Sequence, residues 1–251
     1  VSLPSEQETK RRNLLTENKE LKQSRTQEIN RLHAIFLRCG YTEVVKKNLA
    51  TKENREEISC LLKGFDLEQA RRIMHRIDII EEDINTVDSE INIEVKGDKR
   101  IELLESVPGV GMLTAMAFVA YIGDGSRFHS ASQVSASIGL VPKIDMSGSI
   151  NRYGGISKHG CGYLRSLLVM ASWSLIRSKT DSALKLKYNY MVKFQCKNKR
   201  KAIVAIARKL AELLYIMLRT GSKFEVRPFR KLSAKELAEC AINQKEESGA
   251  A

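Results

Sequence analysis

The sequence predicts an all-α fold, in which a long antiparallel helical or coiled-coil arm precedes a compact helical domain that contains a helix-hairpin-helix. Apolar residues recur at intervals of three and four along most of the 251 residues, as on one face of a helix. Helix-capping residues precede several of these runs. No stretch shows the apolar–polar alternation of a convincing strand. These patterns place the arm at residues 1–97, the compact domain at 98–222, and a basic, then polar tail at 223–251.

A long polar helix opens the arm. Ser5 and Glu8 have the spacing of a capping box, in which each residue's side chain accepts a hydrogen bond from the other's backbone N–H. Gly40 is expected to end this helix, because glycine readily takes the left-handed conformation that follows a helix. Thr51 is expected to cap a shorter helix that follows it.

A second long helix is predicted to start near Asp66. Its apolar residues alternate at spacings of three and four, the pattern of a coiled coil: Ala70, Ile73, Ile77, Ile80, Ile84, Val87 and Ile91. This seam fits packing on the first long helix or on another subunit. We favour an antiparallel arm that contributes to a dimer. The alternative is an amphipathic helix that lies on its own domain.

After a break at residues 97–98, the compact domain opens with Val-Pro-Gly-Val-Gly at 107–111, between two apolar helical patterns. A tight turn of this kind joins the helices of a helix-hairpin-helix. Its glycines allow backbone angles that side chains would block. They also let N–H groups approach a phosphate at the positive end of the second helix. Gly109, Val110 and Gly111 are therefore candidate nucleic-acid contacts. The alternative is an ordinary αα-hairpin with a glycine turn.

Further helices follow in the compact domain. The sequence predicts a helix capped by Ser130 and ended by Gly139, a strongly apolar central core helix over 160–179, a helix capped by Thr180 or Asp181, and a helix that stops near Gly221. A last short helix fits residues 233–241. Residues 140–159 form the longest stretch without a helical period and are expected to be a loop that is either functional or disordered.

The composition favours a polyanionic partner. Lys and Arg number 42 against 30 Asp and Glu, which gives a net charge of +12. An anionic membrane surface also fits this charge, but no apolar segment reaches the ~18 residues of a membrane span. The five cysteines and four histidines are scattered, so they predict no disulfide framework and no metal site in this chain. A reducing cytoplasm fits these scattered cysteines best.

The loop at 140–159 holds the residues best suited to chemistry. Its hydroxyl nucleophiles are Ser147, Ser149 and Ser157, and the cations in and after it are Lys143, Arg152, Lys158 and Arg165. A serine among cations suits attack on a phosphodiester, because the cations stabilise charge on the pentacovalent phosphorus. Residue types do not single out one serine. The alternative is a polar surface loop whose serines only make turns.

A second basic cluster follows at Lys199, Arg200 and Lys201. It fits a patch that follows the phosphates of a nucleic acid. The start of a solvated helix fits it equally well.

Several motifs together resemble a known family. They are, in order, Ser106-Val-Pro-Gly-Val-Gly111, Phe128, Gly139-Leu-Val-Pro142, Ser147-Gly148, Gly155-Ile-Ser-Lys-His-Gly160 and Tyr163-Leu-Arg165. In this order and spacing they look like the C-terminal transposase domain of Piv/MooV-type recombinases. That family includes the bacterial insertion-sequence transposases of the one-hundred-and-ten and eleven-hundred-and-eleven groups. The resemblance covers residues 99–221, and the arm fits more loosely.

The resemblance implies a DNA transposase or site-specific recombinase with a serine nucleophile. Carried onto this chain, the nucleophile falls on Ser147, because Met146 stands where many relatives have another hydroxyl residue. Such enzymes bind magnesium in an N-terminal RuvC-like domain. This chain starts where that domain would be ending, so no cofactor is expected in it.

The resemblance also implies partners and a location. DNA is the expected partner, several members use a guide RNA, and members assemble as homo-oligomers, here a dimer or tetramer through the arm. No membrane partner is expected, and the expected location is the bacterial cytoplasm, at the nucleoid. Two alternative functions remain: a non-catalytic helix-hairpin-helix scaffold that binds DNA or RNA, and a coiled-coil interaction protein with incidental basic charge.

Overall fold

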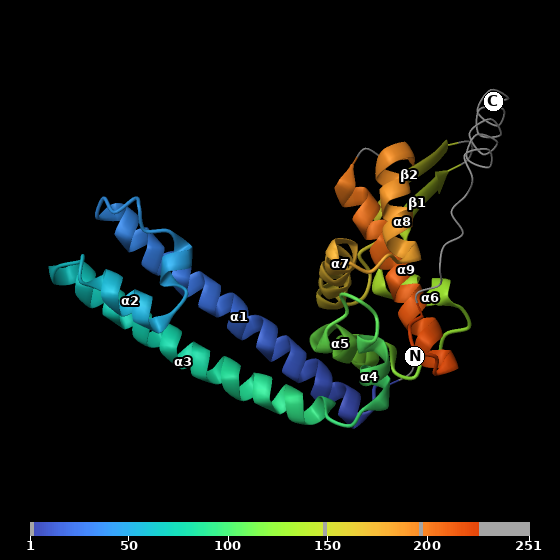
Figure 1. The fold of residues 1–251 in the computed structure, drawn as a ribbon, viewed down its shortest axis with the longest axis horizontal. Helices are drawn as coiled ribbons and strands as arrows, with labels where there is room; N and C mark the ends of the chain where they lie inside the picture. Colours follow the sequence, from blue (N-terminus) through green and yellow to red (C-terminus); the bar gives the residue numbers. More distant parts are fainter. Residues whose placement is uncertain (1–2, 148–149, 196–197, 226–251) are drawn as a thin grey trace.

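A computed structural model describes residues 3–147, 150–195 and 198–225, and of residues 144–153 it describes no side chains. The order of elements is α1 (Glu6–Arg38), η1 (Lys46–Leu49), α2 (Lys52–Ser59), α3 (Gly64–Val95), α4 (Lys99–Glu105), α5 (Met112–Ile122), α6 (Ala131–Ile138), β1 (Pro142–Ser147), β2 (Ile150–Ile156), α7 (Gly162–Arg177), α8 (Ala183–Tyr190), η2 (Met191–Gln195) and α9 (Lys199–Thr220). Helices dominate, which confirms the predicted class. Figure 1 shows two parts, a long arm of α1–α3 and a compact body of α4–α9. The short helix expected at 233–241 lies outside the described residues.

Two helices of the arm, α1 and α2, begin where local capping signals place them. The backbone N–H of Glu8 donates to the hydroxyl of Ser5 over 3.2 Å, and the backbone N–H of Ser5 donates to the carboxylate of Glu8 over 3.0 Å. The capping box is therefore confirmed. Thr51 likewise accepts a hydrogen bond from the N–H of Asn54 at the start of α2. The helix α1 ends at Arg38, just before Gly40, which has a φ of +88°.

The heptad seam of α3 packs on α1 within the same chain. The two helices run antiparallel along the arm (Figure 1). Toward the far end of the arm, Ile73 and Ile77 share an apolar cluster with Leu32 and Phe36 of α1. The fold thus satisfies this seam internally, and a dimer through the arm stays a prediction. The helix α3 starts at Gly64, two residues before the predicted start.

The near end of the arm is joined to the compact body by a buried arginine. Arg11 of α1 is 2% exposed, and it donates to the carboxylates of Glu94 over 3.1 Å and Asp98 over 2.7 Å. Because Asp98 also caps α4, this ion pair connects both arm helices to the first helix of the compact body.

Asp98 makes the stability of this junction dependent on pH. Burial alone would raise the pKa of Asp98, but hydrogen bonds from Arg100 and Arg11 outweigh it and hold that pKa well below its usual range. A carboxylate whose pKa falls on folding stabilises the protein above the unfolded pKa of about 4, and this stabilisation is lost as the pH falls further.

We therefore expect the free energy of unfolding to decrease as the pH falls through about 4 and below. Asp98→Asn keeps a capping side chain but has no carboxylate to protonate, so its acid-induced decrease should be shallower. Urea unfolding at a series of acidic pH values measures the difference. Equal steepness in the two proteins would contradict the role given to Asp98.

The core of the compact body centres on α5. Every residue from Ala115 to Ala120 is fully buried, and the helix contacts α1, α4 and α7. Its small alanines allow close approach of these neighbours. The sequence had pointed to the helix over 160–179 as the central one. The corresponding α7 packs on α5 and α9 but leaves Met170 63% exposed, so α5 is the more central helix.

The segment predicted as a long loop contains two strands. The strands β1 and β2 pair antiparallel, with Met146 opposite Asn151 and an irregularity between Pro142 and Ile144. A two-stranded hairpin is held by backbone hydrogen bonds, which need no apolar alternation. That is why the period of the sequence did not predict it.

No helix in the described part of the chain combines the length and apolar character needed to cross a lipid bilayer.

Candidate functional site

The backbone of Ser147 lies at the turn end of the β-hairpin. Ser147 is the last residue of β1 and pairs with Ile150, the first residue of β2. Figure 1 shows the hairpin on the side of the compact body that faces away from the arm. The side chains of Ser147 and Arg152 lie outside the described part of the structure, as does the whole of Ser149. What the backbone establishes is that Ser147 belongs to a strand end and not to an irregular loop.

The base of the hairpin is fixed to the end of α6. The N–H of Ser157 donates to the carbonyl of Val141 over 2.8 Å, and that of Lys158 donates to the carbonyl of Gly139 over 3.2 Å. Lys158 has a φ of +59°, an uncommon conformation for a residue with a side chain. The side chains of Lys158 and Lys143 are exposed near this base. Both cations are therefore placed where a polyanion can reach them.

Ser157 differs from the other two serines of the predicted loop. Its Oγ is buried and has no hydrogen-bond partner among the residues that the structure describes. A hydroxyl closed off in this way cannot approach the phosphorus of an external DNA strand. Among the three predicted nucleophiles, burial therefore removes Ser157.

Two glycines allow the segment after the hairpin to lie directly on α6. A Cβ on Gly139 would lie 2.3 Å from the carbonyl oxygen of His159, and one on Gly160 would lie 2.1 Å from that of Ser137. Contacts this short with backbone atoms exclude any side chain at either position. These glycines belong to two of the motifs on which the resemblance rests.

Arg165 holds the same two segments together. Its guanidinium donates from Nη1 to the carbonyl oxygens of Ile138 over 2.8 Å, His159 over 2.5 Å and Gly160 over 3.3 Å. Arg165 was predicted to contact phosphate. The structure instead shows Nη1 occupied by contacts within the protein.

We expect Arg165→Ala to lower the free energy of unfolding by about 2 kcal/mol, because three carbonyl oxygens lose a charged donor. Lys199→Ala, which removes an exposed cation elsewhere in the body, should leave stability within about 0.5 kcal/mol of wild type. Urea unfolding measures both. Unchanged stability of Arg165→Ala together with weakened DNA binding would instead favour the predicted phosphate contact.

The turn at 107–111 presents its two glycines to different surroundings. Gly109 has a φ of +88°, and a Cβ there would lie 2.5 Å from the backbone nitrogen of Leu175 and 2.6 Å from the carbonyl oxygen of Ala171, both in α7. Val110 is 5% exposed, and its N–H donates to the carbonyl of Val107 over 3.0 Å. A Cβ on Gly111 would meet nothing within 4 Å. Only the Gly111 end of this turn is open to a ligand.

The second basic cluster forms the first turn of α9. Lys199, Arg200 and Lys201 are exposed, and Asn198 caps the helix by accepting from the N–H of Arg200 over 2.9 Å. Cations in a first turn are unfavourable beside the positive end of the helix dipole. Helix stability therefore does not explain this cluster, whereas an anionic partner would.

Sequence reasoning missed an exposed aromatic pair that precedes this cluster in the chain. The ring centroids of Tyr190 and Phe194 lie 5.2 Å apart, and Phe194 is 65% exposed. Lys193 places its ammonium 5.0 Å from the centre of the Phe194 ring. The i, i+4 spacing of two aromatics beside lysines was the available signal.

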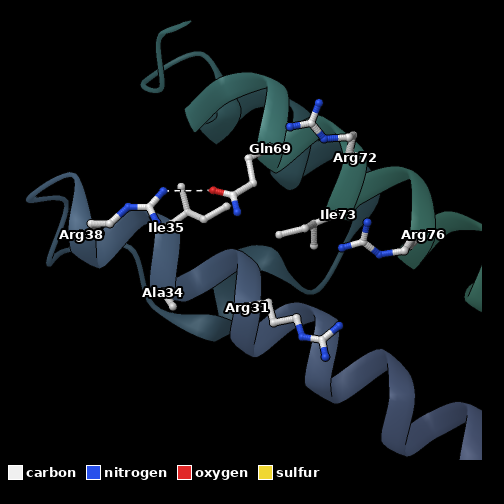
Figure 2. Close-up of a pocket in the computed structure, with 8 residues that line it drawn as sticks. All are labelled: Arg31, Ala34, Ile35, Arg38, Gln69, Arg72, Ile73 and Arg76. Atoms are coloured by element: carbon white, nitrogen blue, oxygen red, sulfur yellow. Dashed lines mark hydrogen bonds between the residues drawn. The ribbon is translucent and has the colours of Figure 1, made fainter. Parts of the chain in front are cut away.

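Sequence reasoning also missed a groove in the arm that four arginines line. Arg31 and Arg38 of α1 and Arg72 and Arg76 of α3 line this groove, and Figure 2 shows which helix carries each of them. Each helix alone gives a scattered basic pattern. Only the antiparallel pairing of α1 and α3 gathers the four side chains on one groove.

Within the described residues, no group of three or more His, Cys, Asp or Glu side chains is placed to hold a metal ion. Magnesium bound by a RuvC-like domain stays a prediction.

Comparisons with known proteins agree on one family. Residues 101–189 match the family model described as transposase IS116/IS110/IS902 family. A probable family 20 transposase of Pseudomonas aeruginosa is 32% identical over 154 residues, which cover 60% of this chain and 45% of that protein. The transposase for insertion sequence element IS1111A of Coxiella burnetii is 29% identical over 205 residues, which cover 79% of this chain and 55% of that protein.

A relative with a differently named activity matches as well. The pilin gene-inverting protein of Moraxella lacunata is 30% identical over 184 residues, which cover 72% of this chain and 56% of that protein. The chain thus spans about half the length of these curated relatives.

Proposed function

We propose that this chain is the C-terminal part of a DNA transposase or site-specific recombinase, because residues 101–189 match the model of the IS116/IS110/IS902 transposase family. In this proposal Ser147 attacks a DNA phosphodiester. The observation that carries it is the backbone position of Ser147, at the turn end of a hairpin that extends from the compact body. Ser147 ends β1, whereas the hydroxyl of Ser157 is buried and cannot reach an external DNA strand.

The proposed step forms one bond and breaks one bond. The Oγ of Ser147 bonds to phosphorus, its proton leaves to a base, and the bond from phosphorus to a sugar oxygen breaks. That oxygen takes a proton and departs as a DNA hydroxyl. The link between the serine oxygen and the DNA phosphate is itself a phosphodiester of similar free energy. A second DNA hydroxyl can therefore attack it, release the serine and join a new strand. Magnesium held by a RuvC-like domain would neutralise charge on the phosphate.

Exposed cations and open backbone on the compact body would hold the DNA. Lys143 and Lys158 lie near the base of the hairpin, Arg152 belongs to β2, and Gly111 marks the open end of the turn before α5. The cluster at 199–201 adds phosphate contacts at the start of α9. Together they would place a sugar–phosphate chain beside Ser147.

The test of this function is a search for a covalent protein–DNA adduct. The chain is fused to the RuvC-like domain of a relative and incubated with magnesium and DNA that carries the element's ends. The mixture is then denatured and separated on a gel. A labelled band at the mass of protein plus DNA supports the proposal. Tight DNA binding without any adduct would favour the non-catalytic scaffold, whose support is the glycine turn between α4 and α5.

Further partners follow from the same proposal. A homo-oligomer would form through the arm, a guide RNA would share the basic surfaces, and the protein would work at the nucleoid in the bacterial cytoplasm. Salt-sensitive binding of DNA and RNA by the purified chain is the first expectation. Negligible binding of both even at low salt would favour the coiled-coil interaction protein.

A further inference from the structure

An arginine groove lies between the two long helices, toward the far end of the arm. We use this name for the groove of about 550 Å³ lined by Arg31, Arg38, Arg72 and Arg76, with Ile35 and Ile73 among its apolar residues. Figure 2 shows two arginines on each helix around the same opening. The groove is distant from the hairpin, which lies on the other side of the compact body (Figure 1).

The carboxylates of the arm only partly neutralise this groove. Glu28 is shared, because it accepts from Arg31 and, over 3.0 Å, from Arg76. Arg38 pairs with Asp66. Four guanidinium groups thus face two carboxylates, which leaves an excess of two positive charges (4 − 2).

Arg72 accounts for part of that excess. Within the described residues, no salt bridge links Arg72 to a carboxylate. Its guanidinium carbon lies 5.9 Å from the centre of the ring of Phe65, which is itself 69% exposed. A cation resting on an exposed ring keeps its N–H donors available.

The guanidinium groups also remain accessible. The side chains of Arg31, Arg38 and Arg76 are 63%, 58% and 48% exposed, while Glu28 is only 10% exposed beneath them. Each guanidinium has five N–H donors, and one ion pair uses one or two of them. Several donors therefore face solvent from both sides of the groove.

We propose that the arm binds the phosphate groups of a nucleic-acid backbone in the arginine groove, separately from the compact body. Planar guanidinium groups bind phosphate through two parallel hydrogen bonds, which lysines do not offer. Four of them along two helices suit successive phosphates of one strand better than a single small anion. The inference rests on the proposed function, since a recombinase handles long nucleic acids.

The test compares two double variants of the full chain that lose the same charge. Arg31→Gln with Arg72→Gln removes two groove cations but keeps the Arg76–Glu28 and Arg38–Asp66 pairs. Lys46→Gln with Lys47→Gln removes two exposed cations of η1, outside the groove. Fluorescence anisotropy with labelled DNA duplex and with labelled RNA is recorded from about 50 to 200 mM salt.

The groove variant is expected to bind about tenfold more weakly than the lysine variant. The slope of its log affinity against log salt concentration should be smaller by the contribution of about two phosphate contacts. Thermal unfolding checks that both variants fold. The DNA and RNA probes show which backbone the groove prefers.

Equal affinity of the two variants would contradict the proposal that the arginine groove binds phosphates, but it would leave the proposed function in place. Absence of binding by the wild-type chain overturns both. A change of sedimentation behaviour confined to the groove variant, with unchanged binding, would assign the groove to contact between copies.

Discussion

Ser147→Ala is expected to reduce formation of the covalent protein–DNA adduct by at least about a thousandfold, because alanine has no oxygen to bond to phosphorus. The pairing of Ser147 with Ile150 is a backbone feature. The substitution should therefore leave the hairpin and DNA binding unchanged. The measurement is the labelled adduct band of the fused protein, with anisotropy as the check on binding.

Two neighbouring serines provide matched controls. Ser157→Ala removes a buried hydroxyl that has no partner in the described structure, so stability should stay equal or rise slightly and the adduct should persist. Ser149→Ala removes the third candidate hydroxyl of the predicted loop and should also keep the adduct. An adduct that survives in Ser147→Ala but is lost in Ser149→Ala would move the nucleophile to Ser149.

Gly109→Ala is expected to lower the free energy of unfolding by about 4 kcal/mol. The added Cβ meets the backbone of α7 at 2.5 and 2.6 Å, and backbone atoms cannot rotate away as a side chain does. The φ of +88° adds the strain of a left-handed conformation. Urea unfolding measures the loss, and a variant too unstable to purify agrees with it.

Gly111→Ala is the matched control in the same turn. Space around Gly111 is open and its φ of −98° is ordinary, so the change should cost less than about 1 kcal/mol. Equal losses at positions 109 and 111 would contradict the packing described for α7. Gly111→Val, which adds bulk only at the open end, should weaken DNA binding if this turn holds a phosphate. Unchanged binding would mean that this turn serves only the packing of the core and does not contact DNA.

The helices of the arm could be predicted because their signals are local. A capping box joins residues three apart, and a heptad seam repeats within one helix. The structure confirms the capping box at Ser5 and the apolar seam of α3. What the seam packs on was left open by the sequence, since an apolar stripe fits any complementary stripe. The pairing with α1 depends on the antiparallel return of the chain through η1 and α2.

The residue types of the candidate site could be predicted from the sequence, but their positions in the fold could not. Serines, cations and glycines at 139–165 were identified as residue types, and the family resemblance selected Ser147. The positions of these residues could not be predicted, because each depends on contact with a segment distant along the chain. Arg165 meets the end of α6, and Gly109 meets α7. A backbone-paired hairpin leaves no periodic pattern for sequence reasoning to detect.

The sequence by itself determined the helical class, the starts of α1 and α2 and the basic charge, and it predicted a set of residues suited to phosphodiester chemistry. These depend on each residue and on neighbours three or four positions away. The tertiary structure alone decided that the seam of α3 closes on α1, that Gly109 serves packing, and that four arginines share one groove. Such outcomes depend on contacts between distant segments, which form only when burial of the apolar surface brings the whole chain together.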